Sequence, residues 1–360
     1  MTLPVNLEFS FIKRTLQFRF EAGTSRGVMH TREVFWIKVH RKVDLDQLGW
    51  GEAAPLAGLS PDFGPDFEAQ LSDVLKQANA RTWDLEEESL LQQVKALVPF
   101  PLPSIRFGLE TALLDFLNGG RKRILANTFF DQGRPIPING LIWMGTKEFM
   151  LQQINQKLGE GFACLKLKIG AIDFAQELEI LRYIREQEAA KDIVLRVDAN
   201  GAFSIQEAMG KLELLQDFGM HSIEQPIAVG QWKAMRELAV KSPIPIALDE
   251  ELIGRPAKEE VLNSIQPQYL ILKPSLLGGI LETREWIQLA EKMGIGWWMT
   301  SALESAIGLN AISQLTSTYL PSLPQGLGTG KLYHNNLESP LLVSNGEIRY
   351  QAEGIWETPS

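Results

Sequence analysis

Five charged residues, each at the end of its own apolar run, are the residues of this chain best suited to chemistry. They are Lys168, Asp198, Glu224, Asp249 and Lys273. Successive members are 30, 26, 25 and 24 residues apart, an interval that holds one strand, one helix and two short loops. A protein core does not bury charges without compensation. The pattern therefore indicates a functional site.

The three carboxylates predict a metal site. Asp198, Glu224 and Asp249 follow three consecutive predicted strands, so they bring three mutually repelling negative charges to one rim unless a cation neutralises them. Mg²⁺ suits such hard oxygen ligands, with Mn²⁺ as a substitute, and no histidine or cysteine at equivalent positions points to zinc. Each carboxylate taken alone fits a helix cap or a surface charge. Three at matching depth favour the metal.

The lysines predict a base beside that metal. Lys166 and Lys168 are two apart on one predicted strand, so their side chains share a face. Near a second ammonium and a divalent cation the neutral amine is favoured, and Lys168, nearer the strand end, is the better base, with Lys166 tuning it. Lys273 approaches from the far side of the metal. Such a site can remove the proton next to a carboxylate and stabilise the charge that develops. Surface lysines on an edge strand are the alternative, which the apolar neighbours disfavour.

The elements that must position these residues form a barrel. From Ile136 the sequence alternates strand-like and helical segments, and continuous apolar runs at this interval are typical of buried parallel strands. The pattern predicts a (β/α)₈-type barrel over residues 126–330, with its first, seventh and eighth strands at 136–144, 294–301 and 323–330. The C-terminal strand ends of such a barrel meet at one face, where catalytic residues sit.

A second, smaller unit precedes the barrel. Residues 1–125 read as an α+β capping domain, with an antiparallel meander and helical segments from residue 64 onward. Two stretches, 21–31 and 49–63, are expected to be loops. Residues 331–360 are expected to return to this domain.

Composition excludes several classes of protein. The 360 residues carry a net charge of −9, which gives no basic footprint for nucleic acid. No apolar stretch approaches membrane-spanning length, and the N-terminus does not resemble a signal peptide. The single cysteine, Cys164, cannot form an intramolecular disulfide, which fits the reducing cytoplasm. The expected partner is a small-molecule carboxylate, and the oligomeric state stays open.

Five short motifs resemble the enolase superfamily over nearly the whole chain. They are Lys166-x-Lys168, Asp198-x-Asn200, Glu224-Gln-Pro226, Asp249-Glu250 and Lys273. A lysine base with Mg²⁺ is an established pattern of that superfamily. A lysine on each side of the carboxylates, with no histidine after the seventh strand, is similar to its muconate-lactonizing-like branch. Within the branch, segments such as GWGEAAPLAGLS, INGLIWMG and SALESAIGLNAI resemble the o-succinylbenzoate synthase family.

This resemblance implies a reaction of menaquinone biosynthesis. A lyase of this family dehydrates 2-succinyl-6-hydroxy-2,4-cyclohexadiene-1-carboxylate to o-succinylbenzoate, with syn geometry and through an enediolate. Lys168 would remove the α-proton and Lys273 would stabilise the enediolate. Asn200 and Glu250 would support the site. The residues expected to contact or cover the substrate are Arg196, Ser301 and Gly326 of the barrel and Ser25, Arg26, Leu56 and Gly58 of the capping loops.

Other reactions fit the same scaffold. In an N-succinylamino acid racemase or a dipeptide epimerase, the two lysines would act as alternating acid and base. Dipeptide epimerases carry an Asp-x-Asp near the eighth strand, whereas this chain has Gly326-Leu-Gly328 there, which disfavours a cationic substrate. N-succinylamino acids stay open because they carry the same succinyl arm, and muconate cycloisomerisation is a third option. A non-enzymatic binding protein would be expected to have lost the lysines and carboxylates, which are intact.

Overall fold

The N-terminal part of the chain is an antiparallel sheet covered by helices. A computed structural model describes residues 4–24, 27–42 and 44–360. The sheet has the order β3-β2-β1-β4, and α3 packs directly on β3, because a Cβ atom at Gly51 would lie 2.0 Å from the carbonyl oxygen of Gly108. The elements are β1 (Val5–Thr24), β2 (Gly27–Arg41), β3 (Asp44–Ala53), β4 (Thr82–Trp83), α1 (Phe67–Asn79), α2 (Glu87–Leu97) and α3 (Pro103–Leu117).

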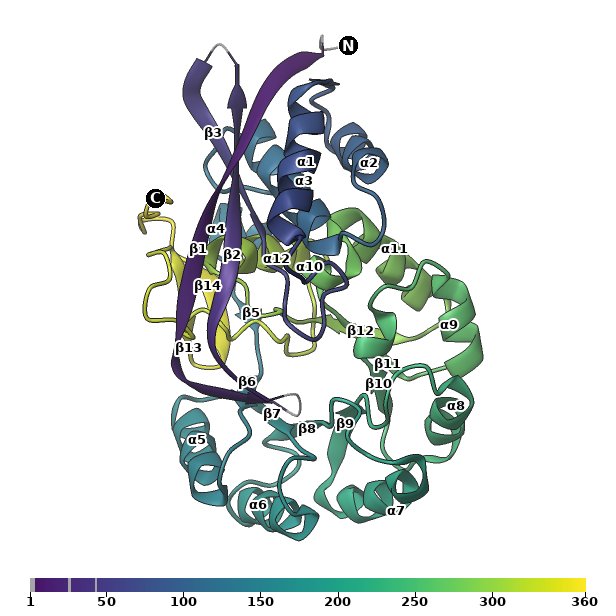
Figure 1. Cartoon of the computed structure of the whole chain (residues 1–360). Coiled ribbons are helices and arrows are strands. Elements are labelled where there is room, and N and C mark those ends of the chain that lie inside the picture. The colour runs from purple at the N-terminus through teal and green to yellow at the C-terminus, as the bar shows by residue number, and fades with distance from the viewer. Residues whose placement is uncertain (1–3, 25–26, 43) are drawn as a thin grey trace.

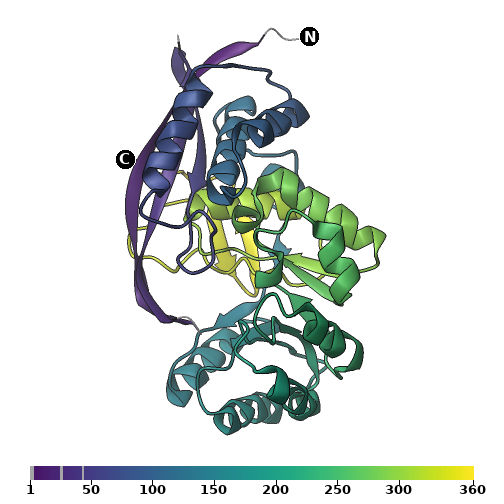
Figure 2. The same ribbon diagram turned by 45° about the vertical axis from the view of Figure 1, so that its right-hand side comes forward.

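The two stretches expected to be loops are partly strand. β1 and β2 pair almost to their tip, with Ala22 opposite Met29 and Thr24 opposite Gly27, so most of 21–31 belongs to a long hairpin. Likewise β3 includes residues 49–53. Glycines suggested turns at these places, but a glycine in a strand also permits close approach of another backbone. The hairpin runs along the barrel and ends at its mouth (Figures 1 and 2).

The second part of the chain is a barrel of parallel strands. Seven strands pair in consecutive order, each with the next. Their outward residues, such as Leu165 and Leu167, are buried under the helices, whereas Lys166 and Lys168 alternate with them and line an interior cavity. The strands are β6 (Gly140–Ile142), β7 (Cys164–Lys168), β8 (Val194–Asp198), β9 (Met220–Glu224), β10 (Ile246–Leu248), β11 (Tyr269–Leu272) and β12 (Gly296–Met299).

The eighth strand is much less regular than expected. Within 323–330 only isolated bridges form, from Gln325 to Ile138 and from Gly326 to Thr300. Backbone hydrogen bonds nevertheless close the barrel on both sides of this segment. Asn139 N donates to Gln325 O at 2.9 Å, and Gly326 N donates to Met299 O at 2.8 Å. The (β/α)₈-type barrel with a capping domain is confirmed.

Helices alternate with the strands, and several of them begin at side-chain caps. Thr146, Asp173 and Ser305 each accept a hydrogen bond from the first turn of the helix that follows, and Ser204 forms a capping box with Glu207. The helices are α4 (Thr128–Gln132), α5 (Lys147–Gly159), α6 (Phe174–Gln187), α7 (Ile205–Leu215), α8 (Trp232–Lys241), α9 (Lys258–Ile265), α10 (Pro274–Leu277), α11 (Gly279–Lys292) and α12 (Ala306–Ser317), with short 3₁₀ turns at Gln216–Phe218 and Glu250–Leu252. In the described residues, no helix has the length and apolar character needed to cross a membrane.

The C-terminal segment contacts both parts of the molecule. Leu332 O accepts from Arg19 N, and His334 N donates to Gln17 O, each at 2.9 Å, so this stretch lies along β1 of the cap. The hairpin of β13 (Leu341–Ser344) and β14 (Glu347–Tyr350) then pairs with β5 (Ile136–Pro137), where the chain enters the barrel.

Candidate active site

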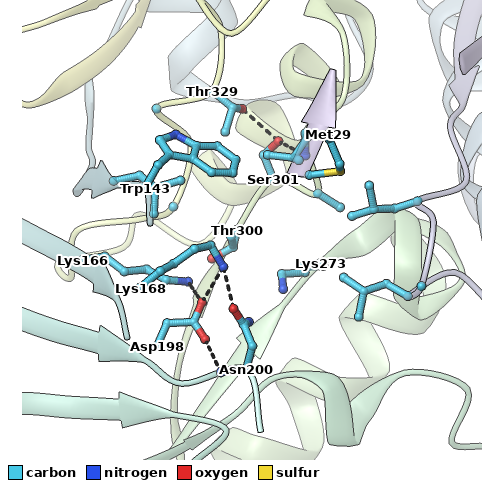
Figure 3. A pocket seen from close by; sticks show the side chains of 18 of the residues that line it. Met29, Trp143, Lys166, Lys168, Asp198, Asn200, Lys273, Thr300, Ser301 and Thr329 are labelled. Carbon is cyan, nitrogen blue, oxygen red and sulfur yellow. Dashed lines mark hydrogen bonds and ion pairs between the residues drawn. The ribbon is translucent and has the colours of Figure 1, made fainter. Parts of the chain in front are cut away.

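A cavity of about 320 Å³ lies at the C-terminal ends of the barrel strands. Its walls come from both parts of the molecule (Figure 3). The barrel supplies Lys166, Lys168, Asp198 and Lys273, and the cap covers them with Met29 of β2 and with residues 56–59. Apolar residues of the cap therefore face charged residues of the barrel across this cavity.

The three predicted metal ligands meet at one point. Asp198 ends β8, Glu224 ends β9 and Asp249 follows β10, and one oxygen of each lies within 4.8 Å of the others. All three side chains are at most 1% exposed. Glu224 Oε1 and Asp249 Oδ1 are buried and have no hydrogen-bond partner in the part of the chain that the structure describes. Buried carboxylate oxygens directed at one another fit a divalent cation. The donor set therefore fits Mg²⁺.

Three lysines surround these carboxylates. Lys166 Nζ lies 3.0 Å from Asp198 Oδ2 and 2.5 Å from Glu224 Oε2. Lys168 Nζ lies 3.2 Å from Asp198 Oδ2, and Lys273 forms an ion pair with Asp249. Because β7 and β11 flank the three ligand strands, Lys168 and Lys273 reach the cavity from opposite sides of the triad.

The electrostatic surroundings of Lys166 and Lys168 differ. Burial lowers the pKa of Lys168, and the ammonium groups of Lys166 and Lys273 lower it further, against the opposing effect of Asp198. Burial also disfavours the ammonium form of Lys166, but the surrounding carboxylates, Asp198 first, outweigh it and raise the pKa of Lys166. Lys168 is therefore the easier of the two to deprotonate, as a general base requires.

Asn200 and Glu250 extend the contacts of Lys168. Lys168 Nζ donates to Asn200 Oδ1 at 2.8 Å, and Asn200 Nδ2 donates to Glu250 Oε1 at 2.9 Å. Asn200 has a φ of +45°, a left-handed conformation that asparagine tolerates. This chain of contacts joins the ends of three strands and fixes the direction of the lysine.

Among the predicted substrate contacts, Ser301, Gly326, Leu56 and Gly58 line the cavity. The hydroxyl of Ser301 is already engaged: it donates to Glu304 Oε2 at 2.6 Å and accepts from Thr329 Oγ1 at 2.9 Å. Ser301 therefore has no proton left to donate to a ligand.

One predicted contact, Arg196, is not at the cavity: this side chain is fully buried one layer deeper, where Nη1 donates to Pro324 O at 2.7 Å. Its guanidinium carbon lies 3.8 Å from the centre of a Trp298 ring. Arg196 shares a face with Asp198 as expected, but two residues along a strand correspond to about 7 Å of depth. Ser25 and Arg26 lie outside the described residues.

Several lining residues were not anticipated. Asn139, Leu141 and Trp143 alternate along the first barrel strand and line the cavity, as do Thr300 and Thr329. Period-two alternation within 136–144 could have identified the first three, because their neighbours Ile138 and Ile142 are apolar and pack outward.

Comparisons with known proteins agree with this geometry. Residues 150–355 match the family described as "Enolase C-terminal domain-like". The chain is 44% identical to an o-succinylbenzoate synthase from Desulfotalea psychrophila, over 94% of this chain and 98% of that protein. It is 27% identical to an N-succinylamino acid racemase from an Amycolatopsis species, over 90% and 87% of the two chains. The crystal structure of MenC from Desulfotalea psychrophila superposes with a TM-score of 0.85 at 41% identity, covering 96% of this chain and 99% of the other.

Proposed function

Because the chain belongs to the enolase C-terminal domain-like family, we propose that it is an o-succinylbenzoate synthase, a metal-dependent lyase. Its reaction is the syn dehydration of 2-succinyl-6-hydroxy-2,4-cyclohexadiene-1-carboxylate, which forms o-succinylbenzoate for menaquinone biosynthesis. The observation that carries this choice is the 44% identity to an o-succinylbenzoate synthase along nearly the whole chain. The cavity between cap and barrel, with lysines on both sides of a carboxylate triad, supports it.

The residues divide the chemistry among them. Mg²⁺, or Mn²⁺ in its place, held by Asp198, Glu224 and Asp249 would acidify the C–H bond next to a substrate carboxylate. Lys168 takes this proton as a neutral amine, since burial and two neighbouring ammonium groups lower its pKa. Now an ammonium on the same face, Lys168 returns the proton to the departing hydroxyl, so that water leaves with syn geometry.

Lys273 acts from the opposite side of the substrate. Burial disfavours its ammonium form, but Asp249 outweighs burial and raises the pKa of Lys273, so this lysine stays charged. The positive charge of this ammonium stabilises the ring of the substrate as the ring gains electron density, and the attraction persists as the ring becomes aromatic.

Met29 and Leu56 of the cap limit the access of water to the reacting carbon. The expected location of the enzyme is the cytoplasm, consistent with a free, buried Cys164.

N-succinylamino acid racemisation is the second candidate function. The 27% identity to such a racemase favours it, and the same two lysines would serve as alternating acid and base. An assay of the purified protein with the cyclohexadiene substrate and with N-succinylamino acids, side by side with Mg²⁺, distinguishes the two by kcat/KM. We expect a clear preference for dehydration. A larger kcat/KM for racemisation would replace the proposed function with the second.

A further inference from the structure

Asn139 is a buried polar side chain in the cavity wall that has no hydrogen-bond partner among the described residues. The residue is 3% exposed, and its Oδ1 atom is buried without a partner. Its amide nitrogen also makes no hydrogen bond with the residues that the structure describes. Buried side-chain polar groups are almost always paired, and an unpaired one destabilises the fold. Asn139 therefore calls for a partner that the polypeptide does not supply.

The position of Asn139 places it opposite the carboxylate triad. It lies between β5 and β6, and its backbone N–H binds Gln325 O of the irregular eighth strand. The carboxylate triad stands at the ends of β8 to β10, across the barrel. A substrate whose ring carboxylate is held at the triad must extend the rest of its structure toward this wall.

The charge beyond Asn139 is positive. Asn139 also lines a neighbouring cavity of about 510 Å³, together with Arg19, Lys157 and Lys331. The carboxylate on that wall is Glu160, which is paired with Lys157 at 2.7 Å. The wall thus carries three cations and one carboxylate: Arg19 donates to the carbonyl oxygen of Tyr333, and Lys331 lies within electrostatic range of Glu160. In a protein with a net charge of −9, this is a local environment suited to an anionic group.

The hydroxyls of Ser301 and Thr329 on the catalytic side are already occupied, whereas Thr300 Oγ1 is buried without a partner among the described residues. Ser301 donates to Glu304, and Thr329 donates to Ser301. The amide of Asn139 is a donor still available beside them. The keto and carboxylate oxygens of a succinyl arm are acceptors, so they cannot pair with the amide oxygen of Asn139. A half-turn of the side-chain amide exchanges its oxygen and nitrogen, and the N–H groups brought to that position match the arm.

We propose that Asn139 is a specificity-determining residue that donates a hydrogen bond to the oxygens of the succinyl arm, with the arm's terminal carboxylate directed toward Arg19 and Lys331. This inference rests on the proposed function and names the residue that recognises its substrate's arm. A site built to hydrogen-bond a ligand group discriminates strongly against ligands that lack the group.

The test compares two ligands that differ only in the arm. Dissociation constants of o-succinylbenzoate and benzoate are measured by calorimetry on the Mg²⁺-loaded protein. Their ratio is the quantity compared between variants, because effects on the ring carboxylate that both ligands share cancel in it. Asn139→Ala should reduce the preference for o-succinylbenzoate about tenfold. Asn139→Asp should reduce it further, since a carboxylate repels the arm. The melting temperature of Asn139→Ala should not fall, because the amide has no partner to lose.

Asn155→Ala is the matched control. Asn155 is exposed on α5 and accepts a hydrogen bond from Tyr183 at 2.8 Å, so its replacement should leave the ligand preference unchanged. An unchanged preference in Asn139→Ala would mean that the amide binds water only, and tighter binding of the arm by Asn139→Asp than by Asn139→Ala would mean that it is not a donor. Either result overturns the inference. Failure of the wild-type protein to dehydrate the cyclohexadiene would instead count against the proposed function.

Discussion

Two groups of buried carboxylates in this molecule look alike in exposure and differ in their partners. The triad Asp198, Glu224 and Asp249 contacts lysines and keeps two oxygens without any partner. Glu52 lies at the seam between the cap and the barrel, equally buried, and accepts from the backbone N–H groups of Ser305 and Gly308 at 2.8 and 2.9 Å.

The difference separates a reactive site from a structural one. Burial raises the pKa of Glu52, but neutral donors of the protein satisfy its oxygens, so it joins two units without needing a ligand. Among the described residues, a single backbone donor reaches the triad, Asn200 N–H to Asp198 Oδ1 at 3.1 Å, and its other contacts are ion pairs with lysines. Glu224 Oε1 and Asp249 Oδ1 are therefore available to a cation, and we propose that the lysines beside them move protons. Burial alone does not identify a catalytic charge; the identity of its partners does.

The largest expected effect is the loss of activity in the lysine variants. Lys168→Ala and Lys273→Ala should each lower kcat for dehydration roughly 10³-fold or more, because each removes a group that acts on the reacting atoms. Circular dichroism should show an intact fold. Substantial turnover by either variant would refute the two-lysine mechanism.

At the seam between the cap and the barrel, replacing Glu52 is expected to lower the stability of the fold. Glu52→Ala leaves the N–H groups of Ser305 and Gly308 buried without acceptors, and should lower the free energy of unfolding by about 3 kcal/mol. Urea denaturation measures the change. Glu52→Gln, which retains an acceptor, is the control and should lose less. If Glu52→Ala unfolds like the wild type while losing activity, the distinction between the two groups is wrong.

A further buried carboxylate, Glu110, predicts a pH dependence of stability. Glu110 of α3 accepts from the backbone N–H of Ile280 at the start of α11, and burial raises its pKa to about 8. The folded state thus holds a proton that the unfolded chain releases near pH 4.5. Its contribution to stability is complete below pH 4.5 and is lost as pH rises toward 8, at up to about 1.4 kcal/mol per unit.

Glu110→Gln should remove this dependence. Denaturation at pH 5.5 and 8.5 should show the wild type losing more stability than the variant between the two values. An equal loss in both proteins would mean that Glu110 does not titrate in this range.

The smallest effect is expected at Arg196. Because its side chain lies below the cavity, Arg196→Met should keep the stacking on Trp298 and change kcat/KM by less than about threefold in the folded protein. A much larger rise in KM would show that Arg196 reaches the substrate after all.

The sequence predicted the barrel and the convergence of its strand ends well, because strand alternation and the strand-to-strand interval are local features. How deep each side chain lies in the barrel was harder to predict. Arg196 and Asp198 share a face, but only the register of the assembled strands shows that Arg196 lies below the cavity. The irregular eighth strand was also missed, since Gly326 pairs through isolated bridges that no local pattern encodes. Whether the side chain of Asn139 finds a hydrogen-bond partner depends on the packing of segments far apart in the chain, so the sequence alone could not predict it.

The most direct test of the central claim is a thermal unfolding series with Mg²⁺. A cation that binds the folded triad raises the melting temperature with concentration. The wild type should show this rise, Asp249→Asn should lose it, and Glu52→Gln at the seam should keep it. A wild-type protein that Mg²⁺ does not stabilise, or an equal rise in Asp249→Asn, would contradict the claim that these buried carboxylates are held for a metal ion.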